Sequence, residues 1–343
     1  MDRDGHLAQL MQASIGASAA GKVLSIVGIA PALLDERDGA VSRAVFAMAL
    51  NGVLFHDLLR RVPTGAAYVE DQRRAKHPIV LDHGALRTIR FADGPTGELP
   101  GGFSSFARIL EPLGYEVTGL YPLERLGMTG RGFTHRDLPE DIPQFFVSEL
   151  HVERFSPAFQ AVARRVFGAT WEPLDDGARA ALTALAERGA CDLDLARSAL
   201  PPLAAAFGRW HALPSLADYE ALLRESPEAA WISTEGNAFN HATSRVADVA
   251  ELAEQQRGLG RPIKKDVEIS ASGRVRQTAF LADPVVRRFP GPTGVVQREA
   301  PGSFFEFISR AREDDGRLDL RFDSANAQGI FAMTSGPPSS PRA

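Results

Sequence analysis

The sequence predicts an α+β fold, because two helical stretches alternate with two groups of short strands. Apolar residues over 5–76 recur at helical spacing. From Pro78 the pattern changes to short β-like runs separated by Pro and Gly, which is typical of a sheet. Helical spacing returns over 156–225, and strand patterns then resume near residue 267. We therefore expect one curved sheet whose strands come from two separate parts of the chain.

The N-terminal part, residues 1–76, is expected to be helical. Two sets of apolar residues are spaced for one helix face each: Leu7, Leu10, Met11 and Ile15, then Val41, Val45, Met48, Phe55 and Leu59. The pattern over 156–225 predicts a helical insertion interrupted by Pro-rich breaks, and a further helix is expected at 246–258.

Short runs of β-branched and aromatic residues predict the strands. The first group is expected at 79–81, 115–118 and 145–147, and the second at 267–269, 275–281 and 304–308. No repeat is evident when the two groups are compared residue by residue. A sheet in two sequence blocks nevertheless leaves room for a diverged duplication.

We expect a single catalytic domain over residues 1–334. A chain of 343 residues with 44% hydrophobic and 24% charged residues can bury a large core, as soluble enzymes do. Residues 335–343 combine Gly and Pro with small polar side chains, so this tail is expected to be disordered. A net charge of −5 argues against a basic surface for nucleic acid and favours small-molecule chemistry. The oligomeric state stays open.

Cysteine content limits both disulfides and metal sites. The one cysteine, Cys191, forms no intrachain disulfide and no cysteine-based zinc cluster, so a metal must be held by histidine and carboxylate. The first residues lack the pattern of a secretory signal, and no apolar run reaches roughly 18 residues. We therefore expect a cytoplasmic protein with no membrane partner.

Glu306 lies within the apolar segment Phe304–Ile308. Alternation along a strand puts apolar residues on both faces beside it. An ionised carboxylate buried without a partner costs several kcal/mol or more, so Glu306 needs a cation, strong donors or a raised pKa. A metal ion meets this need, and an ion pair with an arginine such as Arg310 is the alternative.

Two histidines occur in settings that suit metal ligands. His83 follows a strand-like run, where Asp82 or a backbone carbonyl can orient its second ring nitrogen. His241 follows a polar, turn-prone stretch that can direct its imidazole into a cleft. A histidine in either setting, taken alone, is more often an ordinary hydrogen-bonded residue than a ligand. Of the other six, His151 is the best substitute.

Together, His83, His241 and Glu306 suggest an iron site with two histidines and one carboxylate. This ligand set leaves one face of an octahedral ferrous ion open for a chelating substrate and O2. Imidazole and carboxylate also accept Mn, Ni or Zn, so the ligand types alone do not fix the metal.

Several segments resemble the ferrous 2-oxoadipate dioxygenase/decarboxylase family, in the family's order and over roughly residues 80–331. They are Asp82-His83-Gly84-Ala85-Leu86-Arg87-Thr88, Phe146-Val147-Ser148-Glu149-Leu150, Asn240-His241-Ala242-Thr243, Arg261-Pro262-Ile263-Lys264, Gln277-Thr278, Phe305-Glu306-Phe307 and Gly329-Ile330-Phe331. The resemblance implies a curved, mostly antiparallel sheet of the vicinal-oxygen-chelate type, wrapped around the metal with helices outside.

The resemblance also implies roles for site residues. His83, His241 and Glu306 are the metal ligands, and Arg87 grips a substrate carboxylate, with a structural arginine as the alternative. Gln277 is expected to line the substrate pocket. Two further contacts are Lys264 and Asn326, although strand alternation favours Lys265 over Lys264 as the inward-facing lysine.

The implied reaction uses Fe(II) and O2 to convert a 2-oxo acid, 2-oxoadipate in the family, into 2-hydroxyglutarate and CO2. The chain looks shorter in its C-terminal third than better-known members, which leaves the identity of the acid open. A metal-dependent isomerase or lyase that needs no O2 is one alternative. A non-catalytic protein that binds an organic acid in a polar pocket is the other.

Overall fold

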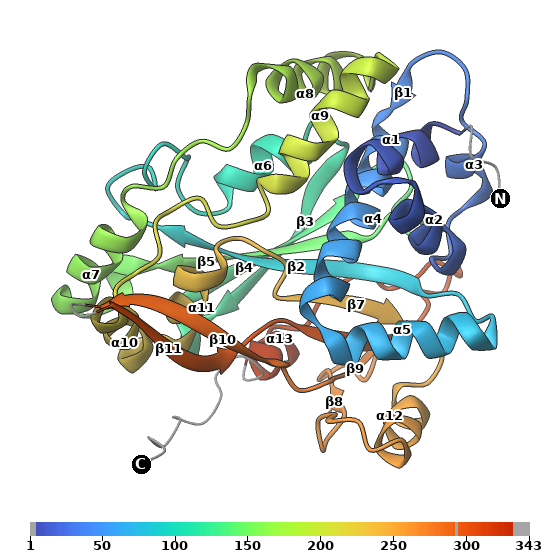
Figure 1. Cartoon of the computed structure of the whole chain (residues 1–343). Coiled ribbons are helices and arrows are strands. Elements are labelled where there is room, and N and C mark those ends of the chain that lie inside the picture. Colours follow the sequence, from blue (N-terminus) through green and yellow to red (C-terminus); the bar gives the residue numbers. More distant parts are fainter. Residues whose placement is uncertain (1–4, 292–293, 332–343) are drawn as a thin grey trace.

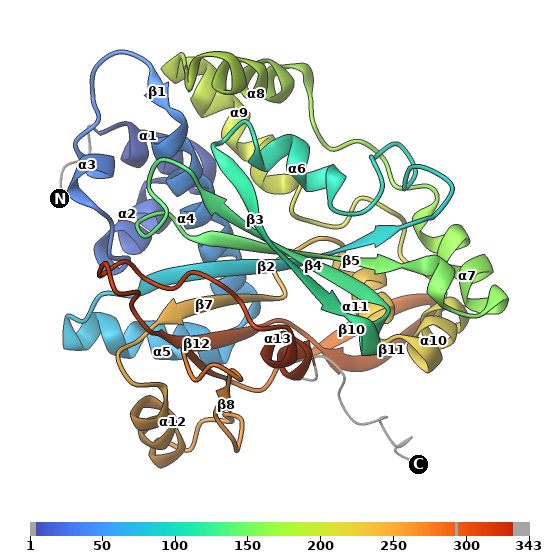
Figure 2. The ribbon, with the colours of Figure 1, turned by 180° about the vertical axis from the view of Figure 1, so that it is seen from behind.

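The computed structural model describes residues 5–291 and 294–331 of the chain (Figure 1). The expected tail at 335–343 lies outside these ranges. Within them, no helix combines the length and the apolar character that a membrane span needs. The fold is α+β, as expected from the sequence: one large curved sheet lies between groups of helices (Figures 1 and 2).

The N-terminal part forms the expected helices, which are α1 (His6–Ile15), α2 (Ala17–Ile26), α3 (Pro31–Leu34), α4 (Arg43–Arg61) and α5 (Pro63–Ala75). Ser42 caps α4, since its side chain accepts a hydrogen bond from the Val45 backbone N–H. Pro63 opens α5, which ends where Lys76 takes a left-handed conformation with φ 58°. A two-residue strand, β1 (Val41–Ser42), pairs with β6 (Ala190–Cys191), and the sequence patterns did not predict this pair.

The main sheet has eight strands in the order β3-β4-β5-β2-β7-β12-β9-β8. Their bounds are β2 (Val80–Arg90), β3 (Tyr115–Leu123), β4 (Met128–His135), β5 (Gln144–His151), β7 (His241–Arg245), β8 (Glu268–Ile269), β9 (Val275–Ala279) and β12 (Phe304–Arg310). Neighbours are antiparallel except at β2–β5 and β7–β12, which are parallel. This confirms a mostly antiparallel sheet drawn from two blocks of sequence.

The sheet consists of two halves with the same topology. In the first half, β2 is followed by α6 (Ser104–Leu110), β3, β4 and β5; in the second, β7 is followed by α12 (Val249–Gly258), β8, β9 and β12. The halves meet at the antiparallel pair β2–β7, where Gly84 lies opposite Ala242. A two-fold axis at this pair makes His83 equivalent to His241. The sheet topology therefore repeats, which is the arrangement that a diverged duplication would leave.

The remaining helices pack against the N-terminal helices, the hairpin β10–β11 (residues 284–301) and the central strand β2. They are α7 (Pro157–Phe167), α8 (Asp176–Arg188), α9 (Leu193–Ala205), α10 (Leu216–Glu225) and α11 (Pro227–Glu235), with short 3-10 turns at Glu124–Leu126 and Val152–Arg154. The helical stretch expected at 156–225 is thus present and continues to residue 235. Asp175, Asp192 and Ser215 cap α8, α9 and α10 through backbone N–H groups.

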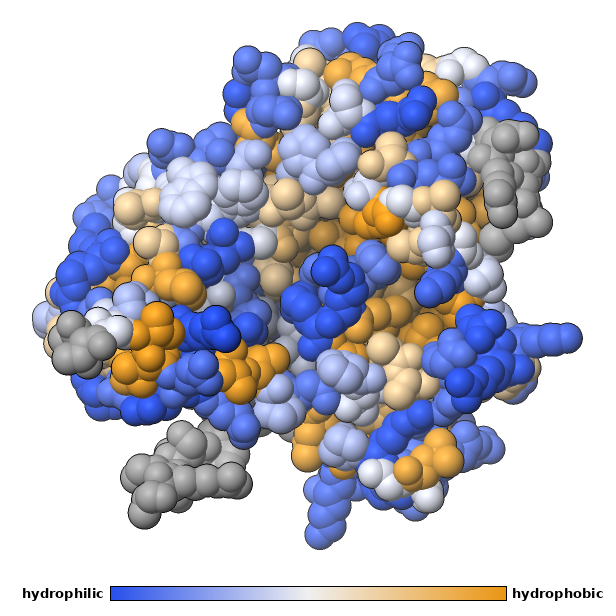
Figure 3. Space-filling view, in the orientation of Figure 1, coloured by the Kyte–Doolittle hydropathy of each residue, from blue (hydrophilic) through white to orange (hydrophobic). Residues whose placement is uncertain are grey.

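A separate hairpin, β10 (Pro284–Gly291) paired with β11 (Gly294–Pro301), lies between β9 and β12 in the sequence and was not predicted. Figure 3 shows apolar side chains at the surface in the region of this hairpin, which Figure 1 labels. Val286 and Val295 are 59% and 66% exposed, and Val285-Val286-Arg287-Arg288 places like residues side by side, so the sequence lacks the apolar–polar alternation by which strands are recognised.

The two faces of β12 have different roles. Phe305 and Phe307 pack against the N-terminal helices, where the Tyr68 ring lies 5.6 Å and 4.8 Å from theirs. Glu306 points to the opposite face of the sheet, as strand alternation requires. On β2, Gly84 lies under the Phe239 ring, and a Cβ there would meet ring carbons at 2.2 Å. The helix-facing side is therefore a packed apolar core, and the other face is left for polar chemistry.

Candidate metal centre

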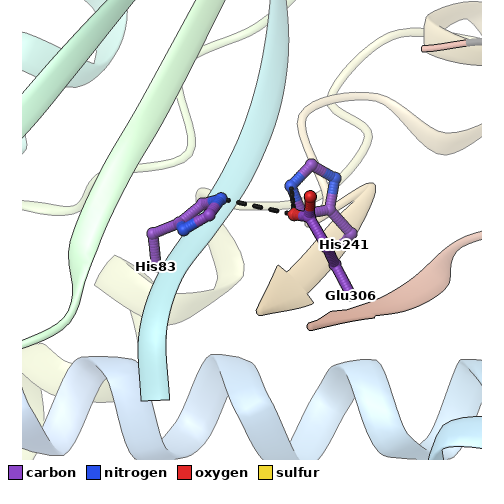
Figure 4. Close-up of side chains that lie close together, drawn as sticks. All are labelled: His83, His241 and Glu306. Carbon is purple, nitrogen blue, oxygen red and sulfur yellow. Dashed lines mark ion pairs between the residues drawn. The ribbon is translucent and has the colours of Figure 1, made fainter. Parts of the chain in front are cut away.

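His83, His241 and Glu306 come together on the three adjacent strands β2, β7 and β12 (Figure 4). One ligand atom from each lies within 4.8 Å of the others, and all three residues are buried. The Glu306 Oε2 atom is 3.0 Å from His241 Nε2 and 3.5 Å from His83 Nε2. Among the described residues, this is the one group of three or more histidine, cysteine and acidic side chains with metal-ligand spacing.

Strand register explains why these residues meet. Thr243 on β7 lies opposite His83 on β2 and beside Glu306 on β12. Residues at the same register position point to the same face of a sheet. The Thr243 hydroxyl donates to Glu306 Oε2 at 2.6 Å and lies 3.1 Å from His83 Nε2. Thr243 thus fixes the carboxylate relative to one of the two imidazoles.

Asp82 supports His83 from behind. The pairing of β2 with β7 shifts between Leu81 and His83, and this bulge lets Asp82 turn toward its neighbour in sequence. Asp82 Oδ1 lies 2.8 Å from His83 Nδ1. The carboxylate also accepts from Arg310 at 2.8 Å and from Arg245 at 2.9 Å. Arg310 is therefore the partner of Asp82 and does not form the alternative ion pair with Glu306.

Asn240 supports His241 in the same way. Its Nδ2 lies 2.9 Å from His241 Nδ1, while its buried Oδ1 has no hydrogen-bond partner. Turning the amide over would present Oδ1 to a protonated Nδ1. His241 Nε2 would then carry its lone pair toward Glu306, as metal binding requires. The orphaned oxygen therefore fits a site built for a cation between the three ligands.

Burial and neighbouring charges move the pKa values of the ligands in different directions. Burial lowers the pKa of His83, but hydrogen bonds to Asp82 and Glu306 outweigh it and raise the pKa above 6.5. Burial lowers the pKa of His241, and Glu306 offsets this only in part. Burial raises the pKa of Glu306, but the two imidazoles overcome it and hold that pKa well below 4.5. Glu306 is thus ionised at neutral pH and ready to bind a cation.

A cavity of about 30 Å³ lies beside the three ligands. Its walls come from both halves of the sheet and from the segment after β12, and they comprise His83, Ala85, Phe146, Ser148, Asn240, His241, Gln277, Glu306, Phe322 and Asp323. Gln277 was predicted to line a substrate pocket, and its side chain is in this wall. Within the described part of the chain, the side toward Phe146 and Ser148 carries no fourth metal ligand.

Arg87 is fully buried on β2, two residues beyond Ala85, and is not part of the cavity wall. Its guanidinium lies over the Trp231 ring, 5.0 Å from the centroid. Burial lowers the pKa of Arg87 to about 10, against the raising effect of the Glu228 carboxylate. Its positive charge contributes to lowering the pKa of His241. Arg87 therefore acts on the site through space in this structure.

The other predicted substrate contacts surround the cavity at a greater distance. Lys264 is largely buried and pairs with Glu268, which also accepts from Gln277 at 3.3 Å, whereas Lys265 is exposed. Lys264 is therefore the inward-facing lysine, in agreement with the resemblance and against strand alternation. Asn326, in α13 (Ser324–Phe331), is 5% exposed and lies outside the wall.

His151, the substitute ligand, lies at the end of β5 away from the group. Its ring contacts the Thr129 hydroxyl at 2.8 Å and an Arg90 nitrogen at 3.1 Å. The sequence patterns missed three residues that contact the site or its supports, Thr243, Arg245 and Phe322, and named Arg310 only as an alternative partner of Glu306. The signal that they offered was their occurrence within or near the matched segments, which does not reveal what each side chain touches.

The fold is of the vicinal-oxygen-chelate type, in which a curved two-half sheet carries a possible metal site, His83, His241 and Glu306, on its inner face. Residues 55–318 match the 2-oxoadipate dioxygenase/decarboxylase family, and the chain belongs to that family of enzymes. The predicted family, fold class and type of enzyme are thereby confirmed.

Individual relatives agree with this placement. A 2-oxoadipate dioxygenase/decarboxylase of Oryza sativa subsp. japonica, named as chloroplastic/amyloplastic, is 25% identical over 81% of this chain and 75% of its own. A crystal structure from Ralstonia eutropha JMP134, named for the glyoxalase superfamily, is 50% identical with a TM-score of 0.88, covering 93% of this chain and 98% of that one.

A more distant structure shares the fold. The hydroxyglutarate synthase of Oryza sativa, solved in complex with 2-oxoadipate, has a TM-score of 0.65 at 21% identity. It covers 90% of this chain and 98% of its own. At this identity the likeness supports the architecture of the sheet and says nothing of individual contacts in the cavity.

Proposed function

We propose that the chain is an Fe(II)-dependent dioxygenase that converts 2-oxoadipate and O2 into 2-hydroxyglutarate and CO2. Membership of the family supports the reaction type, and His83, His241 and Glu306 supply the ligands that non-haem iron oxygenases use. The observation that carries the proposal is the convergence of these three buried side chains on one point beside a cavity.

When bound, iron would supply a Lewis acid that the 2-oxo acid can chelate and a redox partner for O2. The atoms balance: the six-carbon acid and O2 contain the carbon and oxygen of the five-carbon hydroxy acid and CO2. No second oxo acid is needed, because the same molecule is decarboxylated and hydroxylated.

The chain's own residues hold and orient these components. His83, His241 and Glu306 bind the cation, while Asp82 and Asn240 fix the tautomers of the two imidazoles. In the proposal, the Gln277 amide in the cavity wall orients the bound acid. Phe146 and Phe322 exclude water from the side that carries no ligand.

The substrate carboxylates need positive charge beyond the metal. We assign this role to Arg87, whose buried guanidinium acts on the site through space, and to the inward-facing Lys264. Asn326 stays a predicted contact. The cytoplasmic location is likewise a prediction.

The experiment that tests the function is a panel of 2-oxo acids with ferrous protein, in which O2 uptake and CO2 release are measured together. We expect equal amounts of each with 2-oxoadipate, and loss of both in Glu306→Gln, His83→Ala and His241→Ala. His151→Ala is the matched control, since it removes a histidine from the same sheet outside the ligand group. Turnover under nitrogen would favour the isomerase or lyase alternative.

Metal analysis separates an enzyme from a binding protein. After loading with iron and desalting, we expect one ion per chain, lost in the three ligand variants and kept in His151→Ala. Tight binding of an organic acid by protein that retains no ion would refute the proposed iron site.

A further inference from the structure

Phe322 lies against the metal centre without belonging to any helix or strand. Its ring is 4.9 Å from the His83 ring and nearly perpendicular to it, at 88°. The same ring is 5.0 Å from Phe146 and 5.7 Å from Tyr121. The Phe322 backbone N–H donates to the Tyr121 hydroxyl at 3.1 Å. Side chain and main chain thus both hold this residue at the cavity.

The Phe322 ring packs on the sheet in a site bounded by Gly132, Tyr121 and Phe146, here called the seat. A Cβ on Gly132 of β4 would lie 3.1 Å from two carbons of the Phe322 ring. A Cβ on Gly130 would lie 2.3 Å from the Phe146 ring. Glycine at both positions lets the two aromatic rings lie directly on the strand. The equivalent positions of the second half, Ala279 and Gln277, carry side chains.

The space beside the ligands is too small for the proposed substrate while Phe322 occupies this seat. The cavity of about 30 Å³ holds one or two water molecules, since a water needs about 10–15 Å³. Sites for organic ligands typically measure about 300–1,000 Å³. A six-carbon acid therefore reaches the metal only if part of the wall moves.

A much larger cavity, of about 660 Å³, lies on the other side of that wall. It is lined by Tyr121, which also contacts Phe322, and by the segment 317–321. Residues 322 and 323 of the same segment line the inner cavity. The segment 317–323, here called the partition, therefore lines both spaces. Figure 2 shows the chain after β12 crossing the face of the sheet before α13.

Arg310 connects the partition to the metal ligands. Its Nη1 donates to the backbone oxygens of Asp319 at 3.0 Å and Arg321 at 2.7 Å. Its guanidinium lies over the Phe322 ring, 5.1 Å from the centroid, and binds the Asp82 carboxylate behind His83. The base of the partition is therefore fixed, and Phe322 at its tip is held by ring contacts and one hydrogen bond.

We propose that Phe322 is the gate residue of the metal cavity: its ring leaves the seat to admit a 2-oxo acid and thereby determines which acids reach the metal. This inference rests on the proposed function for the identity of the acid. The vacated seat, bounded by Gly132, Tyr121 and Phe146, is apolar and receives the methylene chain.

The rate at which acids associate tests the gate. In anaerobic cobalt-substituted protein, the change in the metal spectrum reports binding in a stopped-flow experiment. We expect Phe322→Ala to accelerate association of 2-oxoadipate about tenfold or more, because binding no longer waits for a minor open state. Azide is small enough for the closed cavity, so its association should change less than about twofold. An acid one methylene longer should gain more than 2-oxoadipate.

Two further variants should accelerate association of the acid to a smaller extent. Phe322→Leu keeps much of the volume, and Gly132→Ala crowds the ring in its seat, so both should accelerate association by less than Phe322→Ala. Phe155→Ala is the matched control, because Phe155 is a partly exposed phenylalanine stacked on Phe159 outside the cavity. It should leave both rates unchanged. These variants also keep the test valid if Phe322→Ala does not fold.

A second readout needs no substrate. Extraction of cobalt by a chelator requires access through the cavity, so Phe322→Ala should accelerate it about tenfold relative to Phe155→Ala.

The outcomes distinguish the gate from the proposed function. If 2-oxoadipate binds no variant while cobalt extraction is faster in Phe322→Ala, the proposed function fails and the gate stands. If 2-oxoadipate associates with wild type and Phe322→Ala at equal rates, the gate is overturned and the function stands. Equal acceleration for azide and 2-oxoadipate would also overturn it.

Discussion

In the first half of the sheet His83 follows Asp82, and in the second half His241 follows Asn240. The pair Gly84–Ala242 relates the two segments, and the relation extends to Arg87 and its counterpart Arg245. The strand scaffold thus supplies each half with an imidazole and a side chain to orient it. The supporting groups differ, since one is a buried carboxylate held by two arginines and the other is an amide.

The last strands of the two halves differ even more. Glu306 on β12 lies beside Thr243, whose counterpart in the first half is Ala85. Ala85 pairs with Phe146 on β5, so Phe146 occupies the position that corresponds to Glu306. A symmetric sheet therefore offers four equivalent positions around the site. Three of them carry the candidate ligands His83, His241 and Glu306, and the fourth carries Phe146, which forms part of the cavity wall. The open side of the site is therefore the side of the first half.

The largest effect is expected when the residue before His83 is made an asparagine, like Asn240 before His241. Asp82→Asn removes the carboxylate from between Arg245 and Arg310, of which Arg310 is fully buried. Breaking one partner of a buried ion pair costs about 3–5 kcal/mol. The loss of support for His83 should also weaken metal binding about 10- to 100-fold. Denaturant unfolding and a metal titration measure the two effects.

Asp137→Asn is the control for this substitution. Asp137 forms a similar double hydrogen bond with Arg43, but its carboxylate is 40% exposed. An exposed pair contributes about 1 kcal/mol or less, so this variant should stay close to wild type in both measurements. Equal losses in the two variants would show that Asp82 has no special role behind His83.

The next largest effect is expected from placing a carboxylate at position 146, which corresponds to Glu306. Phe146→Glu places a second carboxylate opposite Glu306, and an added charged ligand should slow metal release to a chelator about 10- to 100-fold. The same change should abolish binding of 2-oxoadipate, because the open side is then occupied. Phe145→Leu, a substitution on the helix-facing side of the same strand, is the control. Metal release as fast as in wild type would contradict the equivalence of Phe146 and Glu306.

Local patterns predicted those parts of the molecule that depend on neighbours in sequence. The buried strands around Ile79, Phe145 and Phe305 alternate or run apolar, and the three ligands stand out because each is a polar residue in an unusual setting. The hairpin β10–β11 escaped prediction because Val286 and Val295 are exposed on its surface. Leu281, expected in the strand of Gln277, lies beyond the end of β9 and is 44% exposed.

The supports of the site depend on strand register and on contacts between distant residues. Asp82 and Arg310 are 228 positions apart, and Thr243 reaches both His83 and Glu306 only because of how three strands align. The bulge after Leu81 turns Asp82 toward His83 and has no signature in the residues themselves. Pattern reasoning therefore found the ligands and missed what positions them.

A smaller effect is expected at Thr243, where the second half carries a hydroxyl and the first half carries Ala85. Thr243→Ala removes the hydrogen bond to Glu306, and metal affinity should fall about 3- to 10-fold. Thr243→Ser keeps the hydroxyl and should restore affinity to within about twofold. Metal titrations of the two variants measure this difference. A serine variant as weak as the alanine variant would assign the effect to packing of the methyl group.

The smallest effect is the pH response of the metal-free protein, in which the two histidines should behave oppositely. The folded pKa of His83 is raised above 6.5, mainly by Asp82 and Glu306 against burial, so its contribution to stability is full below pH 6.5. That contribution is lost as pH rises through the folded pKa. The folded pKa of His241 is lowered by burial, so the contribution of His241 to stability is lost as pH falls below 6.5.

NMR of labelled histidines should show His83 titrating above pH 6.5 and His241 below it. In Asn240→Asp, which gives His241 the carboxylate that His83 has, the His241 titration should move upward toward that of His83. An unchanged His241 titration would mean that the difference between the halves does not come from their supporting residues.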